Sequence, residues 1–221
     1  MSMAHKILVS DFDGTMTAED FYLLAVERLL QPEDLRFWQE YRMGRITHFT
    51  ALQSIFRRIR APEDTVLELI RDMHPDPALA DSVAALHGAG WRVIVASAGC
   101  AWYIDRILKP LGLSLEVYAN PGTYHEGGPL EMEEPAATPF YSPETGVDKA
   151  GIVRFHLERG ALTAYAGDGH TDLEAALLVE PGLRFARAAL AGALAERGVE
   201  YRPFERWSDV ARQLLAMEAG S

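Results

Sequence analysis

The sequence predicts an α/β fold: a doubly wound, Rossmann-like parallel sheet with a small helical cap inserted after its first strand. Short apolar runs typical of buried strands alternate with helical patterns after residue 76. Four consecutive helical patterns without a strand lie between residues 19 and 73. The 221 residues are 48% hydrophobic and 24% charged, which suffices for one full core and a modest second lobe.

The cap is predicted over 18–75, and the core over 1–17 and 76–221. The first strand is predicted over 7–10, because this apolar run contains two β-branched residues and ends at Asp11. Helical spacing then recurs in the segments DFYLLAVERLL, EDLRFWQEYRM, THFTALQSIFRRI and PEDTVLELIRDM. Short breaks that contain proline or glycine separate these segments, at 31–32, 44–45 and 61–62.

Helix and strand alternate after the prolines at 75 and 77. We expect a helix through about 87, a strand over 92–96, a helix from about 100 to 111 and a strand over 115–118. The segment 120–146 is rich in Gly, Pro and Glu and is expected to be surface loop, with a hairpin turn at 127–128. The remaining expected elements are a helix over 148–158, a strand over 163–166, a turn over 167–169, a helix from 170, a strand over 183–186 and a closing amphipathic helix from 203. This rhythm is typical of a parallel sheet with crossover helices.

Charge and cysteine content exclude several classes of partner. The formal net charge of −11 argues against a nucleic-acid partner, which requires clustered cations. The four-residue apolar run near the start is too short for a signal peptide or a membrane span, so we expect a cytoplasmic protein without a membrane partner. Cys100 is the only cysteine, so no intrachain disulfide can form, and we expect it to be a small apolar helix residue.

The segment DFDGT carries the strongest chemical signal, because it follows a predicted buried strand directly. Ligands of open α/β sheets bind beyond the carboxyl ends of the strands. Asp11 and Asp13 can therefore divide the labour of a group transfer: Asp11 attacks, and Asp13 exchanges a proton with the leaving oxygen. Gly14 permits a sharp turn, and Thr15 offers a hydroxyl to a phosphate oxygen. The competing interpretation of both acids is a simple turn or helix cap.

Two further segments could bind an anion near these acids. The hydroxyl of Ser97 and the amides of Ala98 and Gly99 follow the second strand and would form an anion-binding nest at a helix start. Lys149 lies in the first turn of a predicted helix, where its ammonium could offset the charge of the attacking carboxylate and the phosphate. The alternatives are an ordinary helix cap for Ser97 and a solvated lysine at 149.

The segment GDGHTD completes a candidate Mg²⁺ site. Mg²⁺ takes oxygen ligands and keeps several waters, so two or three protein oxygens suffice. We expect these to come from Asp11, the backbone carbonyl of Asp13, and Asp168. Asp172 could hold a metal-bound water or orient Lys149. The competing interpretation is a turn acid at 168 and a first-turn helix acid at 172.

In this chain order, DFDGT, the serine at 97, the lysine at 149 and GDGHTD resemble the motifs of the haloacid dehalogenase superfamily of aspartate-nucleophile phosphatases, over residues 7–172. The resemblance implies phosphoryl transfer, because the members that work as dehalogenases lack the acid found here at Asp13. A cap in this position, with SDFDGTMTAED and GDGHTDLEAA, is similar to the phosphoserine phosphatase branch. It is more similar still to the methionine-salvage phosphatases that act on 2-hydroxy-3-keto-5-methylthiopentenyl-1-phosphate.

The cap supplies candidates for closing over a substrate. Asp20, Phe21, Tyr22, Arg42 and Arg45 are the candidates, against the alternatives of a buried core for the aromatic residues and a solvated helix face for the arginines.

Other candidates have stronger structural alternatives. His170 is expected to face the mouth of the site, although a lone histidine is more often structural or exposed. The aromatic residues at 37, 38 and 56 are expected to be core.

Together these features predict a Mg²⁺-dependent phosphoric monoester hydrolase that acts on a small phosphorylated metabolite. One alternative is a phosphotransferase or mutase that passes the phosphoryl group to an acceptor other than water. The other is a non-catalytic phosphate-binding module, which the intact pair of acids disfavours. The sequence leaves open the choice of substrate and whether the chain forms a homodimer.

Overall fold

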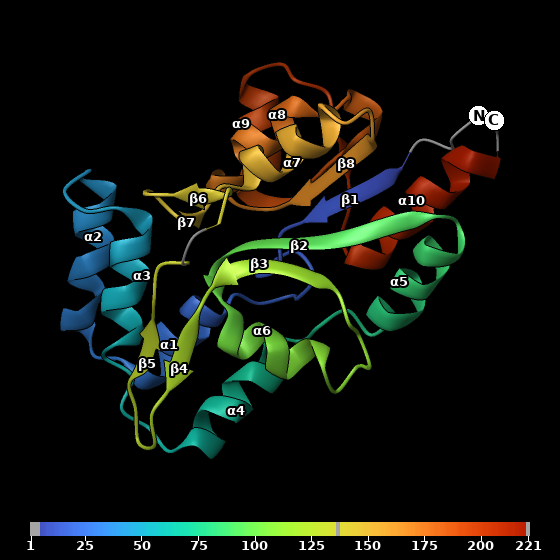
Figure 1. Ribbon diagram of the computed structural model, residues 1–221. Helices are drawn as coiled ribbons and strands as arrows, with labels where there is room; N and C mark the ends of the chain where they lie inside the picture. Colours follow the sequence, from blue (N-terminus) through green and yellow to red (C-terminus); the bar gives the residue numbers. More distant parts are fainter. Residues whose placement is uncertain (1–4, 136–137, 220–221) are drawn as a thin grey trace.

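The structure is a computed structural model that describes residues 5–135 and 138–219 (Figure 1). Six strands form one parallel sheet in the order β10-β9-β8-β1-β2-β3. These strands are β1 Lys6–Ser10, β2 Trp91–Cys100, β3 Glu116–Asn120, β8 Leu162–Gly167, β9 Arg184–Ala186 and β10 Arg202–Pro203. The chain leaves the central β1 toward β2 on one side and later returns to β8 on the other, so the predicted doubly wound sheet is confirmed.

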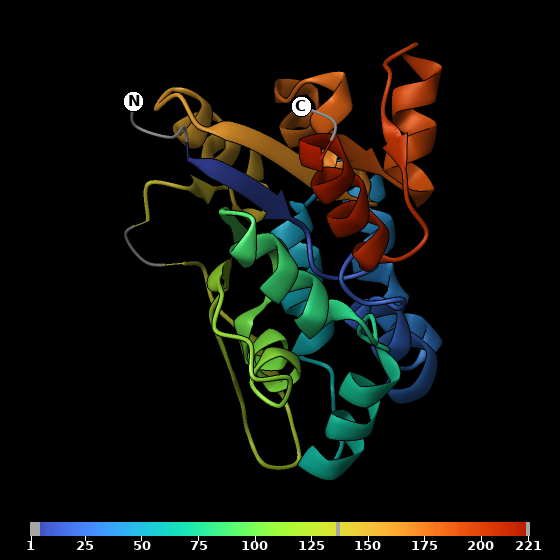
Figure 2. The same cartoon turned by 90° about the vertical axis from the view of Figure 1, so that its right-hand side faces the viewer.

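Helices cover both faces of the sheet. One face carries α7 Lys149–Leu157, α8 Leu173–Leu178 and α9 Ala188–Glu196, and the other carries α5 Leu79–Gly88, α6 Ala101–Leu108 and α10 Trp207–Ala219 (Figure 1). Figure 2 shows α5 and α10 side by side. Alternate residues of β1 supply the two cores, because successive side chains of a strand point to opposite faces: Ile7 and Val9 belong to one buried cluster and Leu8 to the other.

The predicted helical insertion contains α1 Phe21–Leu29, α2 Arg36–Arg42, α3 His48–Phe56 and α4 Glu63–Asp72, with a 3₁₀ turn over Pro32–Leu35. An antiparallel bridge between Thr17 and Pro75 brings the two ends of this insertion side by side. We call α1 to α4 the cap. Its buried side chains are continuous with the core cluster under the sheet, as Phe21 stacks on Tyr103 of α6 with ring centroids 4.4 Å apart. The cap therefore shares a core with the sheet.

The segment over 120–146 is more ordered than the expected surface loop. Within its described residues it forms a hairpin of β4 Gly122–Tyr124 and β5 Leu130–Met132 around the predicted turn, and a second pair, β6 Tyr141–Ser142 and β7 Gly146–Val147. The amide of Gln53 in α3 donates a 2.7 Å hydrogen bond to the Met132 carbonyl. The backbone N–H of Phe49 donates to the Glu144 carbonyl at 2.8 Å. This segment therefore binds the cap through hydrogen bonds to α3. Its Gly-, Pro- and Glu-rich composition did not predict these contacts.

Two local expectations need correction. Cys100 is the last residue of β2 and is fully buried, so its placement in a helix was wrong. The helix expected from 170 begins with a 3₁₀ turn over His170–Asp172 before α8, and α9 was missed because its alanine-rich sequence has little periodicity.

Among the described residues, none of the helices has the length and apolar character that crossing a membrane requires.

Candidate active site

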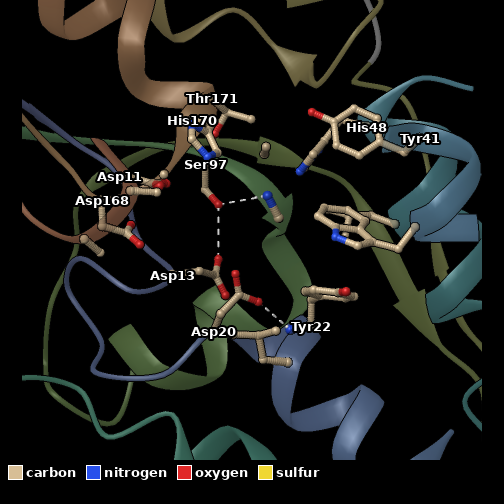
Figure 3. A pocket seen from close by; sticks show the side chains of 18 of the residues that line it. Asp11, Asp13, Asp20, Tyr22, Tyr41, His48, Ser97, Asp168, His170 and Thr171 are labelled. Atoms are coloured by element: carbon tan, nitrogen blue, oxygen red, sulfur yellow. Dashed lines mark hydrogen bonds between the residues drawn. The ribbon is translucent and has the colours of Figure 1, made fainter. Parts of the chain in front are cut away.

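A cavity of about 380 Å³ opens between the carboxyl edge of the sheet and the cap. Its floor is acidic, with Asp11 from the end of β1 and Asp168 from the end of β8. These strands are neighbours, so the groups that follow them meet at one edge. Figure 3 shows Asp11, Asp13 and Asp168 on one side of the cavity and Tyr22, Tyr41 and His48 of the cap on the other.

Lys149 links two acids beneath the cavity. Asp148 caps the N-terminus of α7 by accepting a 2.8 Å hydrogen bond from the Gly151 N–H, which puts Lys149 in the first turn. The ammonium of Lys149 lies 2.8 Å from Asp11 Oδ1 and 2.6 Å from Asp172 Oδ1. Its side chain is only 4% exposed. Burial alone would lower the pKa of Lys149, but the attraction of Asp11 and Asp172 outweighs it and raises that pKa, so the lysine stays charged.

Asp11 is held so that one oxygen stays available. The backbone N–H of Phe12 donates a 2.7 Å hydrogen bond to Asp11 Oδ1, the same oxygen that Lys149 contacts. Among the described residues, Asp11 Oδ2 accepts no hydrogen bond. Burial and the nearby charge of Asp172 raise the pKa of Asp11 well above its usual value. The carboxylate of Asp11 is therefore repelled by neighbouring carboxylates, and a bound cation or an incoming electrophile would reduce this repulsion.

Asp172 lies behind Lys149 and orients it. Besides Lys149, its Oδ1 accepts a 2.6 Å hydrogen bond from the Tyr165 hydroxyl, while Oδ2 accepts from the N–H groups of Asp168 and Gly169 at 3.0 and 2.8 Å. Both oxygens are therefore occupied. Of the two roles considered for Asp172, this arrangement favours the orientation of Lys149.

Asp168 depends on two residues of the DFDGT segment. Thr15 is 1% exposed and donates a 2.8 Å hydrogen bond to Asp168 Oδ1, so its hydroxyl positions an acid and does not line the cavity. Gly14 has a φ of +67°, and a Cβ there would lie 2.5 Å from Asp168 Oδ2. The glycine therefore provides both the turn and the space for this carboxylate.

Replacing Gly14 with alanine is expected to raise the Mg²⁺ concentration for half-maximal activity by about 10- to 100-fold, because the new methyl group displaces Asp168. Titration of activity with Mg²⁺ measures this effect. The matched control is Gly44→Ala, which has the same φ of +67° but no atom within 4 Å of the added Cβ. Both variants should lose about 1 kcal/mol of folding stability from backbone strain. Equal Mg²⁺ requirements in the two variants would contradict the role of Gly14.

Asp13 is held by a residue that the motifs did not indicate. The hydroxyl of Tyr103 donates a 2.8 Å hydrogen bond to Asp13 Oδ2, and the backbone N–H of Phe21 donates to Oδ1 at 3.2 Å. Ser97 Oγ lies 3.4 Å from Asp13 Oδ2 (Figure 3). Burial and the nearby charge of Asp20 raise the pKa of Asp13 to about 7. Asp13 can therefore carry or release a proton near neutral pH.

The residues of the predicted anion nest, 97–99, lie within β2 and not after it, because this strand continues to Cys100. The register of β2 with β3 shifts between Ala96 and Cys100, and this bulge carries Ser97, Ala98 and Gly99 to the cavity. The Gly99 N–H is already engaged, since it donates a 2.9 Å hydrogen bond to Ser97 Oγ. A Cβ at Gly99 would lie 1.8 Å from the Tyr103 hydroxyl, so the glycine lets that hydroxyl reach Asp13.

Replacing Tyr103 with phenylalanine should keep the stacking on Phe21 but remove the hydrogen bond to Asp13. We expect kcat to fall about tenfold, with a loss of about 1 kcal/mol in folding stability. Steady-state kinetics and thermal unfolding measure the two effects. Tyr118→Phe is the control, because its hydroxyl also donates to a carboxylate, that of Glu116, but outside the cavity. A similar fall in kcat for both variants would show that Tyr103 has no specific role.

The cap wall of the cavity is mainly aromatic and aliphatic. Trp38 is only partly buried and lines it, so the expectation that Trp38 is only core was wrong, whereas Phe56 is fully buried in the core as expected and also borders the cavity. Phe21 is fully buried and therefore fills the core, which was the alternative considered for it. Tyr22 lines the cavity and can therefore contact a substrate. The residues of this wall are Tyr22, Leu23, Trp38, Tyr41, Arg42, His48, Leu52 and Phe56.

Most of the predicted site residues converge on this cavity. Those that line it are Asp11, Asp13, Asp20, Arg42, Ser97, Ala98, Gly99, Lys149, Asp168 and His170. Arg45 is not among them, because it follows the end of α2 and is exposed. Asp20 caps α1 by accepting a 2.7 Å hydrogen bond from the Tyr22 N–H (Figure 3). The sequence did not indicate Tyr41 or His48, since neither a motif nor a strand end marks them, and Thr171 lies in the GDGHTD segment but was not singled out.

The acidic floor fits a hard divalent cation. Carboxylate oxygens of Asp11, Asp168 and Asp172 lie within 4.8 Å of one another. Burial, followed by the charge of Asp172, raises the pKa of Asp168 to about 6, so these acids repel one another. Oxygen donors are the ligands that Mg²⁺ prefers. Because both oxygens of Asp172 already accept hydrogen bonds, Asp11 and Asp168 are the better direct ligands.

Comparisons with known proteins agree with the motifs and the fold. The sequence profile of the family described as haloacid dehalogenase-like hydrolase matches residues 8–177. A 2-hydroxy-3-keto-5-methylthiopentenyl-1-phosphate phosphatase from Brevibacillus brevis is 24% identical over 216 residues, 96% of each chain. The same-named protein of Exiguobacterium sibiricum is 24% identical over 96% of this chain and 97% of its own. A solved substrate-bound phosphoserine phosphatase complex has a TM-score of 0.65 at 18% identity, covering 96% of this chain and 97% of that one.

Proposed function

Because this chain belongs to the haloacid dehalogenase-like hydrolase family, we propose that it is a Mg²⁺-dependent phosphatase that hydrolyses a small phosphate monoester through an aspartyl-phosphate on Asp11. The observation that carries the proposal is the position of Lys149, which lies between Asp11 and Asp172 under the cavity. A buried ammonium beside a carboxylate lets that carboxylate approach a phosphate dianion.

Asp11 would attack phosphorus in line with the leaving oxygen. One oxygen of the Asp11 carboxylate would attack while the other contacts the metal; Lys149 and the Phe12 N–H hold the carboxylate in place through Oδ1. As the bond from Asp11 to phosphorus forms, the bond from phosphorus to the leaving oxygen breaks. The charge of Lys149 stabilises the negative charge that gathers on the phosphoryl oxygens.

Asp13 would act first as an acid and then as a base. Its pKa of about 7 means that a large fraction carries a proton at neutral pH, which it donates to the leaving oxygen. The resulting carboxylate then removes a proton from the water that attacks phosphorus and releases phosphate from Asp11. Tyr103 and the Phe21 N–H hold this carboxylate in one orientation throughout.

Asp11 and Asp168, with the backbone carbonyl of Asp13, would hold Mg²⁺, which when bound supplies positive charge beside the phosphoryl oxygens. Thr15 and Gly14 keep Asp168 in place for this purpose.

The cap wall supports an organic ester with an apolar part. Arg42 is the one arginine among the residues found to line the cavity, and its side chain is exposed. Four of the eight residues of this wall are Tyr, Trp or Phe, which suits a methylthioalkyl enol phosphate better than the charged amino-acid part of phosphoserine. The names of the relatives from Brevibacillus brevis and Exiguobacterium sibiricum point in the same direction.

A substrate panel tests the proposal. Purified protein would be given 2-hydroxy-3-keto-5-methylthiopentenyl-1-phosphate, O-phosphoserine and an aryl phosphate, each with Mg²⁺ and with a chelator. We expect Mg²⁺-dependent phosphate release from all three, highest for the methylthio ester. Release that persists in the chelator would refute the metal requirement. A phosphorylated alcohol formed in the presence of added alcohols would instead indicate a phosphotransferase.

A further inference from the structure

His48 is a polar residue in the aromatic cap wall. It is the first residue of α3 and lines the cavity opposite the acids (Figure 3). Its ring makes edge contacts with Trp38 and Tyr41, with centroids 5.4 and 5.3 Å away. Its backbone N–H donates a 3.1 Å hydrogen bond to Glu144 Oε1. Ring packing and this backbone contact therefore fix the position of the imidazole, without any hydrogen bond to the ring itself among the described residues.

The two ring nitrogens of His48 differ. Nδ1 is buried and has no hydrogen-bond partner among the described residues. Burial, followed by the charge of Lys149, lowers the pKa of His48 to about 4, so the ring is neutral at physiological pH and carries a single N–H. A buried N–H without an acceptor is rarer in proteins than an unsatisfied acceptor. The proton therefore belongs on Nε2, and the ring has one donor to offer.

We propose that His48 is a specificity-determining residue whose Nε2–H donates a hydrogen bond to a carbonyl or hydroxyl oxygen on the leaving group of the phosphate ester. The assignment rests on the proposed phosphatase function. It predicts preference for esters that carry such an oxygen over alkyl esters of the same size, because a donor in an aromatic wall loses its hydrogen bond to water when an apolar group covers it.

The sharpest test compares two esters that differ at one carbon. Hydroxyacetone phosphate and n-propyl phosphate have the same three-carbon chain, and only the first has a carbonyl oxygen. We expect wild type to prefer the ketone by about tenfold in kcat/KM, mainly through KM. His48→Phe keeps the ring contacts with Trp38 and Tyr41 but has no donor, so the preference should disappear.

Two amide variants identify the nitrogen. His48→Gln places an amide near the position of Nε2 and should keep most of the preference, whereas His48→Asn places it near Nδ1 and should lose it. His87→Phe is the matched control, because His87 is exposed on α5 and does not line the cavity, and it should keep the wild-type preference. Thermal unfolding of each variant confirms that it is folded.

Several results would overturn the assignment: no ketone preference in wild type, an unchanged preference in His48→Phe, or retention by His48→Asn but not by His48→Gln. Failure of the phosphatase proposal looks different, since wild type would then hydrolyse neither ester. In that case calorimetric binding of both esters, to wild type and to His48→Phe, decides the role of His48. A ketone preference in binding that depends on His48 supports the assignment, and its absence refutes it.

Discussion

Replacing Asp11 with asparagine should lower the turnover of an aryl phosphate by about 10⁴-fold or more, because the variant lacks the proposed nucleophile, on which the phosphoryl group would be carried. Asparagine has nearly the same shape as aspartate, and Lys149 keeps its contact with Asp172. The loss should therefore appear in kcat, which steady-state kinetics at saturating substrate and Mg²⁺ measures. Mass spectrometry of acid-quenched protein should detect a phosphoryl group on wild type and none on the variant.

The stability of Asp11→Asn separates loss of chemistry from loss of folding. Burial and the charge of Asp172 raise the pKa of Asp11, so its charged form destabilises the metal-free protein at neutral pH. An uncharged amide removes this repulsion, and the variant should unfold at the same temperature as wild type or a higher one. Asp81→Asn, on the exposed surface of α5, is the control and should keep full activity. Retained turnover by Asp11→Asn would rule out the nucleophile assignment.

Replacing Lys149 with methionine should reduce kcat/KM by about 10³-fold. The phosphoryl oxygens would lose a positive charge that is already in position before the reaction begins. The variant also leaves Asp11 and Asp172 buried without their ammonium partner. We therefore expect a loss of about 3 kcal/mol in the free energy of unfolding at pH 7. Kinetics and urea unfolding in a chelator measure the two effects.

The stability loss of Lys149→Met should become smaller as the pH falls. Burial raises the pKa of Asp172, but Lys149 and hydrogen bonds outweigh it, so the pKa is lowered in the native protein. Without Lys149, the folded pKa of Asp172 should exceed its unfolded value. Such a group destabilises the fold above its unfolded pKa and stops doing so as the pH falls below it. The difference from wild type should therefore shrink between pH 7 and pH 4.

A double variant tests the cause of that loss. Lys149→Met with Asp172→Asn removes the buried charge that the single variant leaves unpaired. It should recover much of the stability without recovering activity. A double variant as unstable as the single one would show that packing around Lys149, not its charge, supports the fold.

Much of the site could be predicted because its groups follow strand ends. Parallel strands present their carboxyl ends at one edge of the sheet. Asp11 after β1 and Asp168 after β8 therefore lie close together, because β1 and β8 are neighbours in the sheet. Lys149 was predicted from its place in a first helical turn, and the structure brings it to Asp11. Phosphoryl chemistry could be argued on this basis before any contact was known.

Other features had no local signal. Tyr103 reaches Asp13 only because α6 packs against the cap and Gly99 leaves room for its hydroxyl. Thr15 was expected at the phosphate, yet it bonds Asp168 after a turn that brings positions 15 and 168 together. The sequence did not indicate the cap wall either. Helical periodicity predicts which face of a helix is apolar, but it does not show whether that face lies against a core or a cavity.

The sequence by itself determined that alternating strands and helices form a parallel sheet, and which groups follow its strand ends, because periodicity and strand ends are properties of neighbouring residues. Only the tertiary structure decided which side chains hold those groups in place and which rings the substrate would meet. Those contacts join residues about 90 to 150 positions apart, as in the pairs Asp13 with Tyr103 and Thr15 with Asp168, and they exist only when the cap and the sheet share one core.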